Sequence, residues 1–187
     1  MAAWVWVIVI VAIVAIVALV VWSAMRKRRT RSLQQSFGPE YERTMQTTGG
    51  RRQAEAELDA RRKRRQQLDI RPLAPASRQR YSEQWSATQS RFVDSPADAV
   101  READVLVIQV MRERGYPVDG FEQRSSDVSV DHPDVVENYR SAHAISLAND
   151  QGQAGTEDLR QAMVHYRALF QDLLSTGDDT GQMGEAR

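Results

Sequence analysis

The hydrophobic pattern of the chain begins with one long apolar run, residues 2–22, which contains no charged residue, proline or glycine. A helix of this length rises by about 30 Å, which is enough to cross the hydrocarbon core of a bilayer. Only a helix satisfies its own backbone hydrogen bonds in lipid, so the many β-branched residues here do not argue for strands. Trp4, Trp6 and Trp22 stand near the two ends, where aromatic rings favour the headgroup zone. The run predicts a transmembrane helix.

Five cations follow the run directly: Arg26, Lys27, Arg28, Arg29 and Arg31. Positive residues beside a membrane segment stay on the cytoplasmic side, so we expect the N-terminus outside and residues 26–187 inside. The alternative is a cleaved secretory signal. Such a signal has a positively charged start, a core of roughly 7–15 apolar residues and a small-residue cleavage site. Here the start carries no Lys or Arg and the site near Ser23 is poor.

Beyond the run, the apolar spacing predicts helices, and no strand pattern or internal repeat is convincing. The expected helices cover residues 32–37, 39–48, 51–69, 76–93, 99–114, 121–130, 134–148 and 156–174. We therefore expect an all-α chain in four parts. These are the transmembrane helix (2–22), a basic juxtamembrane helical neck (26–70), a cytoplasmic helical bundle (76–175) and a disordered tail (176–187).

Two helices of the bundle have clear apolar faces. Tyr81, Trp85 and Phe92 recur at helical spacing, and such an aromatic stripe is expected to pack into the core. The helix over residues 99–114 is the most apolar one outside the N-terminal run. We therefore place it at the centre of the bundle.

The helix over residues 51–69 has the opposite character. Its apolar positions are few, and Arg61 and Arg65 occupy the same face as Leu58. The pattern predicts a solvated helix laced with ion pairs four residues apart.

Charge is divided along the chain, although the net charge is zero. Residues 1–80 hold 16 Lys/Arg and 6 Asp/Glu, whereas residues 81–187 hold 9 and 19. Cations near an anionic cytoplasmic leaflet each gain about 1 kcal/mol. We therefore predict membrane lipids with anionic headgroups as partners of the neck. The candidate membrane-surface residues are Arg26, Lys27, Arg28, Arg29, Arg31, Arg61, Arg62, Lys63, Arg64 and Arg65.

The basic neck could in principle read nucleic acid instead. RNA-binding surfaces interleave aromatic residues among their cations for base stacking, and residues 51–72 contain none. The composition therefore disfavours a nucleic-acid partner.

Candidate chemistry is sparse. The chain has three histidines and no cysteine, and no two histidines stand four residues apart, so we expect neither a metal site nor a cofactor. Ser129, Asp131 and His132 are close in sequence, but near neighbours seldom present their side chains to one another as a catalytic triad requires. His132 is expected to serve as a cap or turn residue.

One constellation on the last two helices is more interesting. Because these helices are expected to pack antiparallel, four side chains on them become candidates for a buried polar network or a small-anion pocket. They are Arg140, His143, His165 and Arg167.

Several short motifs resemble a family of bacterial proteins with one N-terminal membrane segment, often labelled only as hypothetical, membrane or secreted. They are FGPEY at 37–41, RGYP at 114–117, SVDHP at 129–133 and HYR at 165–167. The resemblance implies a bacterial inner-membrane protein. It carries no known activity, cofactor or catalytic residue.

Together these patterns favour a non-enzymatic, membrane-tethered cytoplasmic interaction module. It would act as a scaffold or an accessory subunit of a membrane complex, with a protein partner in or at the membrane. The alternative is a regulatory helical domain that binds a small anionic ligand. An enzyme of unrecognised type is the third hypothesis.

Overall fold

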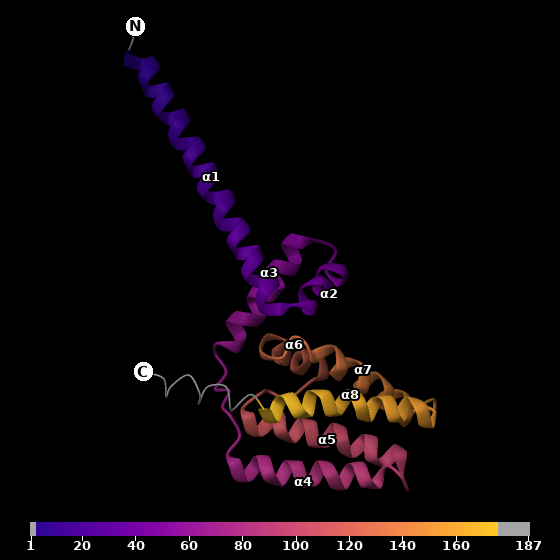
Figure 1. The fold of residues 1–187 in the computed structure, drawn as a ribbon. Helices are drawn as coiled ribbons and strands as arrows, with labels where there is room; N and C mark the ends of the chain where they lie inside the picture. Colours follow the sequence, from indigo (N-terminus) through magenta and orange to yellow (C-terminus); the bar gives the residue numbers. More distant parts are fainter. Residues whose placement is uncertain (1–2, 176–187) are drawn as a thin grey trace.

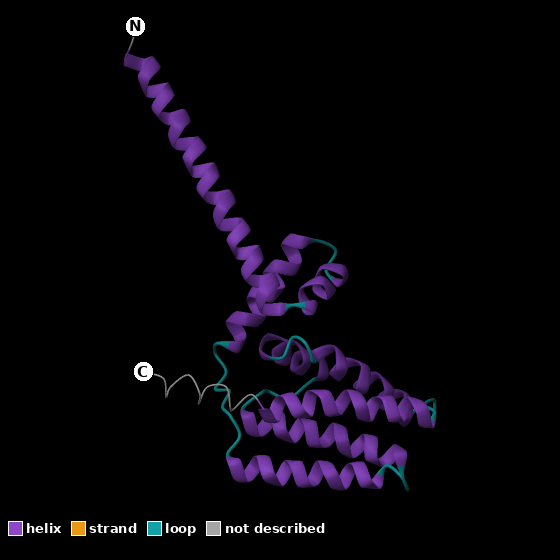
Figure 2. Cartoon of the chain, viewed as in Figure 1, coloured by secondary structure: helices purple, strands orange, loops and turns teal. Residues whose placement is uncertain are grey.

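The computed structural model describes the backbone of residues 3–175, with the side chains of all of these except 3, 5, 7, 10 and 12. All regular secondary structure in this range is helical (Figure 2), which confirms the all-α prediction for the described residues. The predicted disordered tail lies outside the described residues. The helices are α1 (Ala3–Phe37), α2 (Pro39–Thr47), α3 (Arg51–Arg65), α4 (Pro75–Arg91), α5 (Pro96–Arg114), α6 (Phe121–Asp131), α7 (Val136–Asp150) and α8 (Thr156–Ser175).

α1 begins in the apolar run and continues without a break through the basic cluster to Phe37. Its 35 residues make it about 50 Å long. Its N-terminal part projects away from the other helices, while its C-terminal end packs against α2, α3 and α6 (Figure 1). Over the part of the chain that is described, no helix reaches the length and apolarity needed to cross a membrane.

α1 ends at Gly38, whose φ of 44° lies in the left-handed region that favours glycine. Pro39 then occupies the first turn of α2, where its missing N–H costs no hydrogen bond. This turn folds α2 and α3 back onto the base of α1, so that the neck has a small core of its own. Leu33, Phe37 and Leu58 are fully buried there.

The prediction of a solvated helix over residues 51–69 is wrong for one face of α3. Ala54 and Leu58 are fully buried, and Arg61 and Arg65 on the same face turn inward to carboxylates. The helix also ends at Arg65, earlier than predicted. α3 therefore packs against α1, α2 and α6 and is part of the folded core of the neck.

The bundle is organised around α5, as its apolar sequence predicted. α5 packs against α4, α7 and α8, and α7 and α8 lie antiparallel beside each other (Figure 1). The aromatic stripe of α4 is in the core as expected: Tyr81 and Trp85 are buried, and Trp85 stacks on Phe170 with 4.6 Å between ring centroids.

The segment between α3 and α4 crosses the C-terminal end of α5. There the Arg71 N–H donates to the Arg114 carbonyl at 2.9 Å, and Leu73 is buried in the bundle core. Gly115 ends α5 with φ of 98°, and its Cα faces the Asp69 backbone so closely that an added Cβ would overlap the carbonyl oxygen. The join between neck and bundle is thus a packed contact.

Candidate functional site

The basic cluster of α1 presents most of its cations to solvent. Arg26, Lys27, Arg28 and Arg31 are all exposed. Arg29 is also more than half exposed, but it forms an ion pair with Asp59 of α3. The five predicted membrane-facing cations of α1 are therefore on the surface, and one of them, Arg29, is also paired with α3 of the neck.

The second basic cluster, on α3, divides into outward and inward residues. Lys63 and Arg64 are exposed, although Arg64 approaches Asp127 at 3.7 Å. Arg62 is partly exposed and donates to Asp59 at 3.0 Å. The other two members pair with carboxylates of other helices: Arg61, 11% exposed, with Glu40, and Arg65, 25% exposed, with Asp131. The structure therefore corrects their assignment to a membrane-facing surface.

Glu40 is the centre of the inward set. Its side chain is 1% exposed, and it accepts hydrogen bonds from Arg61 of α3 at 2.6 Å and from Arg140 of α7 at 2.7 Å. Both arginine side chains are 11% exposed. Residues 100 positions apart are thereby joined, and we call Glu40, Arg61 and Arg140 the ionic junction.

The charge of Glu40 is favoured in the folded state. Burial alone would raise the pKa of its carboxyl, but the hydrogen bonds and charges of Arg140 and Arg61 outweigh burial and hold the pKa below its ordinary value of 4.5. A carboxylate with two buried cationic partners needs both of them, because an isolated charge in this position would be poorly solvated.

A second contact joins the neck to the bundle nearby. Asp131 at the end of α6 accepts hydrogen bonds from Arg65 and from the Tyr116 hydroxyl, the latter at 2.5 Å. Burial, reinforced by the charge of Asp131, raises the pKa of Tyr116, so this phenol stays protonated as a donor. Both contacts use arginines of α3 to hold acidic residues of other helices.

The four residues predicted to form a polar network or anion pocket have different surroundings. Arg140 belongs to the ionic junction. His143 stacks on Phe121 with 3.8 Å between ring centroids, and its buried Nδ1 has no hydrogen-bond partner among the described residues. Burial lowers the pKa of His143, which favours the neutral ring.

The other two members of that set are separate again. His165 Nδ1 lies 2.9 Å from Asn138 Oδ1, which links α8 to α7. Arg167 is exposed. Three of the four side chains make separate contacts and the fourth is exposed, so they do not define a ligand pocket.

The closely spaced Ser129, Asp131 and His132 also diverge. The Ser129 hydroxyl donates to the Ser126 carbonyl at 2.7 Å, Asp131 faces Arg65, and His132 pairs through Nδ1 with Asp172 of α8. No triad geometry results. His132 is the C-cap of α6, which confirms its expected cap role.

The sequence did not reveal the buried surroundings of His132. Its Nε2 lies 3.5 Å from Arg114, and Arg114 donates to the Leu173 carbonyl at 2.8 Å. This cluster closes the C-terminal end of α8 over α5 and α6. Its partners are 18 and 40 residues away along the chain, beyond the reach of any local pattern.

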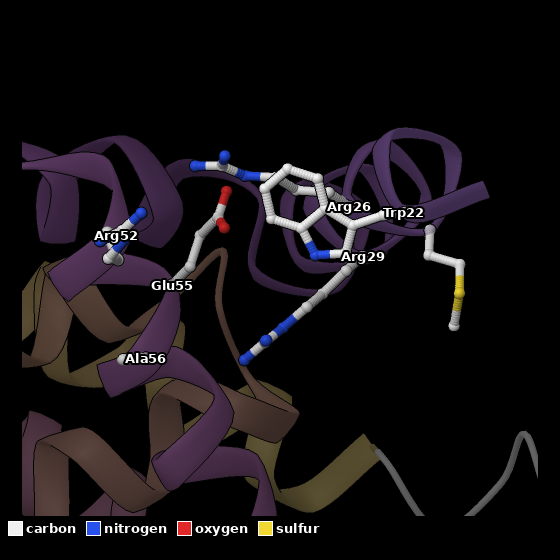
Figure 3. A pocket seen from close by; sticks show the side chains of 7 residues that line it. Trp22, Arg26, Arg29, Arg52, Glu55 and Ala56 are labelled. Atoms are coloured by element: carbon white, nitrogen blue, oxygen red, sulfur yellow. The ribbon is translucent and has the colours of Figure 1, made fainter. Parts of the chain in front are cut away.

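A concave feature of mixed apolar and polar chemistry lies at the base of the apolar run. A cleft of about 500 Å³ opens between α1 and α3, and its lining combines apolar and cationic side chains. The lining residues are Trp22, Met25, Arg26, Arg29, Arg52, Glu55 and Ala56. In Figure 3, Arg26 and Arg29 extend from α1 toward α3, where Arg52 and Glu55 stand.

Glu55, which lines this cleft, is hydrogen-bonded to neighbouring side chains. Its Oε1 accepts hydrogen bonds from Thr30 at 2.8 Å, Tyr41 at 3.2 Å and Arg51 at 2.9 Å. Burial would raise the pKa of Glu55, but these hydrogen bonds, that of Arg51 foremost, lower it. The Glu55 carboxylate therefore links α3 to α1 and α2 within the neck. The arginines that line the cleft give it its cationic character.

Among residues 3–175, no group of His, Cys, Asp or Glu side chains is arranged to hold a metal ion. Comparisons of the chain with models of protein families, with curated proteins and with solved structures found no match. The resemblance seen through the four short motifs stays a prediction.

Proposed function

We propose that this chain is a single-pass, membrane-anchored helical module without enzymatic activity, whose bundle acts on the cytoplasmic side as a scaffold or accessory subunit. The observation that carries the proposal is the exposure of apolar side chains on α1. From Trp4 to Met25, the large apolar side chains whose exposure is described are 40% to 68% exposed. Consecutive positions of a helix face all sides, and the N-terminal part of α1 projects away from the other helices (Figure 1).

Such a surface is unfavourable in water. Burying one large apolar side chain gains about 1.5–3 kcal/mol, so this segment needs an apolar environment. A partner protein would cover one face of the helix, whereas lipid covers every face. The uncharged sequence of residues 2–22 fits lipid, since a lipid-immersed helix is apolar all round.

The cations at the end of the run support the orientation. Arg26, Lys27, Arg28 and Arg31 are exposed immediately after it, at the level where cytoplasmic headgroups would lie. The basic neck would then lie against the anionic leaflet. The acidic part of the chain, residues 81–187 with 19 acidic and 9 basic residues, includes most of the bundle. The bundle would face the cytoplasm and carry the binding surface for a protein partner.

Neutralising the exposed cations Arg26, Lys27, Arg28 and Arg31 to Gln should change the topology from uniform to mixed. Arg29 is kept because it pairs with Asp59. Reporter fusions at the C-terminus measure the fraction inside, and alkaline carbonate extraction measures insertion. The matched control changes four other exposed cations without an ion pair among the described residues, Lys63, Arg71, Arg112 and Arg167, to Gln. They lie beyond the roughly 15–20 residues over which flanking cations orient a span.

Two outcomes of this experiment would count against the proposal. Release of the unaltered chain by carbonate would show that α1 is not embedded in lipid. A uniform orientation that survives the neutralisation would show that other features set the topology.

The scaffold role predicts a partner that depends on the bundle. Crosslinking in intact membranes, followed by mild detergent extraction, should recover a stable partner with the full chain and lose it when residues 38–187 are replaced by an unrelated soluble domain. The partner, tagged in turn, should recover this chain. Recovery of the same proteins with both baits would contradict a binding role for the bundle.

The competing hypothesis of an anionic-ligand domain has less support, because the residues it invoked have different partners. Arg140 is neutralised by Glu40, and His165 bonds to Asn138.

A further inference from the structure

Two arginines that line the cleft between α1 and α3 have no carboxylate partner among the described residues. Among the described residues, Arg26 and Arg52 form no ion pair, and the guanidinium of Arg26 lies 5.7 Å from the centre of the Trp22 ring. Both side chains belong to exposed residues that line the cleft. Guanidinium groups bind phosphate with paired, charge-assisted hydrogen bonds. The cleft therefore offers a site for a phosphate group.

An apolar groove continues from this cleft along α1. It measures about 490 Å³ and shares Trp22 and Met25 with the cleft, so the two features are contiguous. The groove is lined by Ile13, Val14, Val17, Ala18, Val21, Trp22 and Met25. These positions recur three or four residues apart and so lie on one face of the helix.

The length of the groove suits one chain of a lipid. From Ile13 to Met25 the helix rises by about 18 Å, close to the roughly 15 Å of hydrocarbon in one leaflet. A ligand that fits both parts must have a phosphate at one end and a long apolar chain at the other.

We infer that the cleft and groove together bind one anionic glycerophospholipid of the cytoplasmic leaflet, with its phosphate between Arg26 and Arg52 and an acyl chain along α1. The inference rests on the proposed membrane insertion of α1. It differs from general attraction of cations to an anionic leaflet, because it assigns binding to two particular arginines and not to the other exposed cations of the neck. Arg28 and Arg31 do not line the cleft and serve as the matched comparison.

Trp22 is a built-in reporter because it lines both features. The full chain, in a Trp4→Phe/Trp6→Phe background, is reconstituted in phosphatidylcholine vesicles. Equal mole fractions of brominated phosphatidylglycerol or brominated phosphatidylcholine are added to quench its fluorescence. Trp85 is buried in the bundle and supplies a constant background. The quenching curves should give phosphatidylglycerol a preference of about fivefold or more at Trp22.

Two double variants of equal charge then test the residues. Arg26→Gln/Arg52→Gln should abolish the preference, whereas Arg28→Gln/Arg31→Gln should retain most of it. Equal loss in both variants would overturn the site in favour of diffuse attraction. Equal quenching by the two lipids in the parent chain would also overturn it.

The same experiment separates the remaining possibilities. Loss of the preference on adding soluble glycerol phosphate at a concentration no higher than that of the lipid would show that the acyl chain adds nothing to binding, which contradicts the lipid assignment. Quenching by neither lipid would place Trp22 outside the bilayer, and this would contradict the membrane insertion of α1 together with the lipid site.

Discussion

Glu40→Gln is expected to lower the free energy of unfolding by about 3–5 kcal/mol, because it leaves two buried arginines without their shared carboxylate. The substitution preserves the shape of the side chain and removes its charge. The measurement is urea denaturation of the full chain in a mild non-ionic detergent. Glu137→Gln is the control, since Glu137 also pairs with Arg140 but is 60% exposed, and it should cost no more than about 1 kcal/mol.

The acid response gives the same prediction a second readout. The pKa of Glu40 is lowered in the folded state, so its contribution to stability is present above pH 4.5 and is lost as the pH falls below that value through the folded-state pKa. Glu40→Gln should therefore lose less stability than the unaltered chain over this acid range. An unchanged acid dependence would mean that Glu40 is not charged in the ionic junction.

The cost of Glu40→Gln should also be reversible by a designed replacement. Changing Glu40, Arg61 and Arg140 together to Met removes all three charges at once, and apolar substitution of a whole buried ionic group is often neutral or stabilising. The triple variant should be more stable than Glu40→Gln alone. If it is less stable, the junction contributes mainly through its geometry.

Gly115→Ala is expected to destabilise the chain by about 3 kcal/mol, combining left-handed backbone strain with a steric conflict. Gly115 has φ of 98°, and a Cβ there would overlap the carbonyl of Asp69, a backbone group that cannot rotate away. The conflict falls where the segment between neck and bundle crosses the end of α5. Thermal unfolding of the full chain in detergent measures the effect.

Gly152→Ala is the matched control for this prediction. Gly152 has φ of 70° and no atom within 4 Å of an added Cβ, so only the backbone strain of about 1–2 kcal/mol applies. Equal losses at the two positions would show that the crossing segment can move aside.

Much of the fold could be predicted because its signals are local. Pro39 and Pro96 stand in the first turns of α2 and α5, and Gly115 ends α5 in a left-handed conformation, which are the positions that these residue types favour. The spacing of apolar residues likewise placed Tyr81 and Trp85 in the core. Such signals act within one or two helical turns and depend little on the rest of the chain.

The ionic junction could not be predicted, because charge patterns do not specify distant partners. Arg61 and Arg65 were read as solvated although they continue the buried face of Ala54 and Leu58. That continuity was the available signal, since an arginine in line with buried residues needs an internal carboxylate. Nothing along the chain identified Glu40, which is 21 residues from Arg61 and 100 from Arg140.

Local pairings were predicted with mixed success for the same reason. The i,i+4 pairs of Arg51 with Glu55 and of Glu57 with Arg61 form as expected. Asp59, however, pairs with Arg29 and Arg62, although the four-residue spacing predicts Lys63 as its partner. Arg29 of α1 also pairs with the Asp59 carboxylate. The sequence of α3 alone could not predict a partner from another helix.

The uninterrupted course of α1 has a mechanical consequence. The helix has no proline or glycine from Ala3 to Phe37, and its last turns are fixed in the neck by Leu33 and Phe37. It therefore behaves as a stiff lever with no joint at the bilayer surface. A tilt of about 10° over its roughly 50 Å would sweep one end sideways by about 9 Å relative to the other. A thinner bilayer, or contact with another transmembrane helix, would change the tilt of α1 and reorient the whole bundle together with α1.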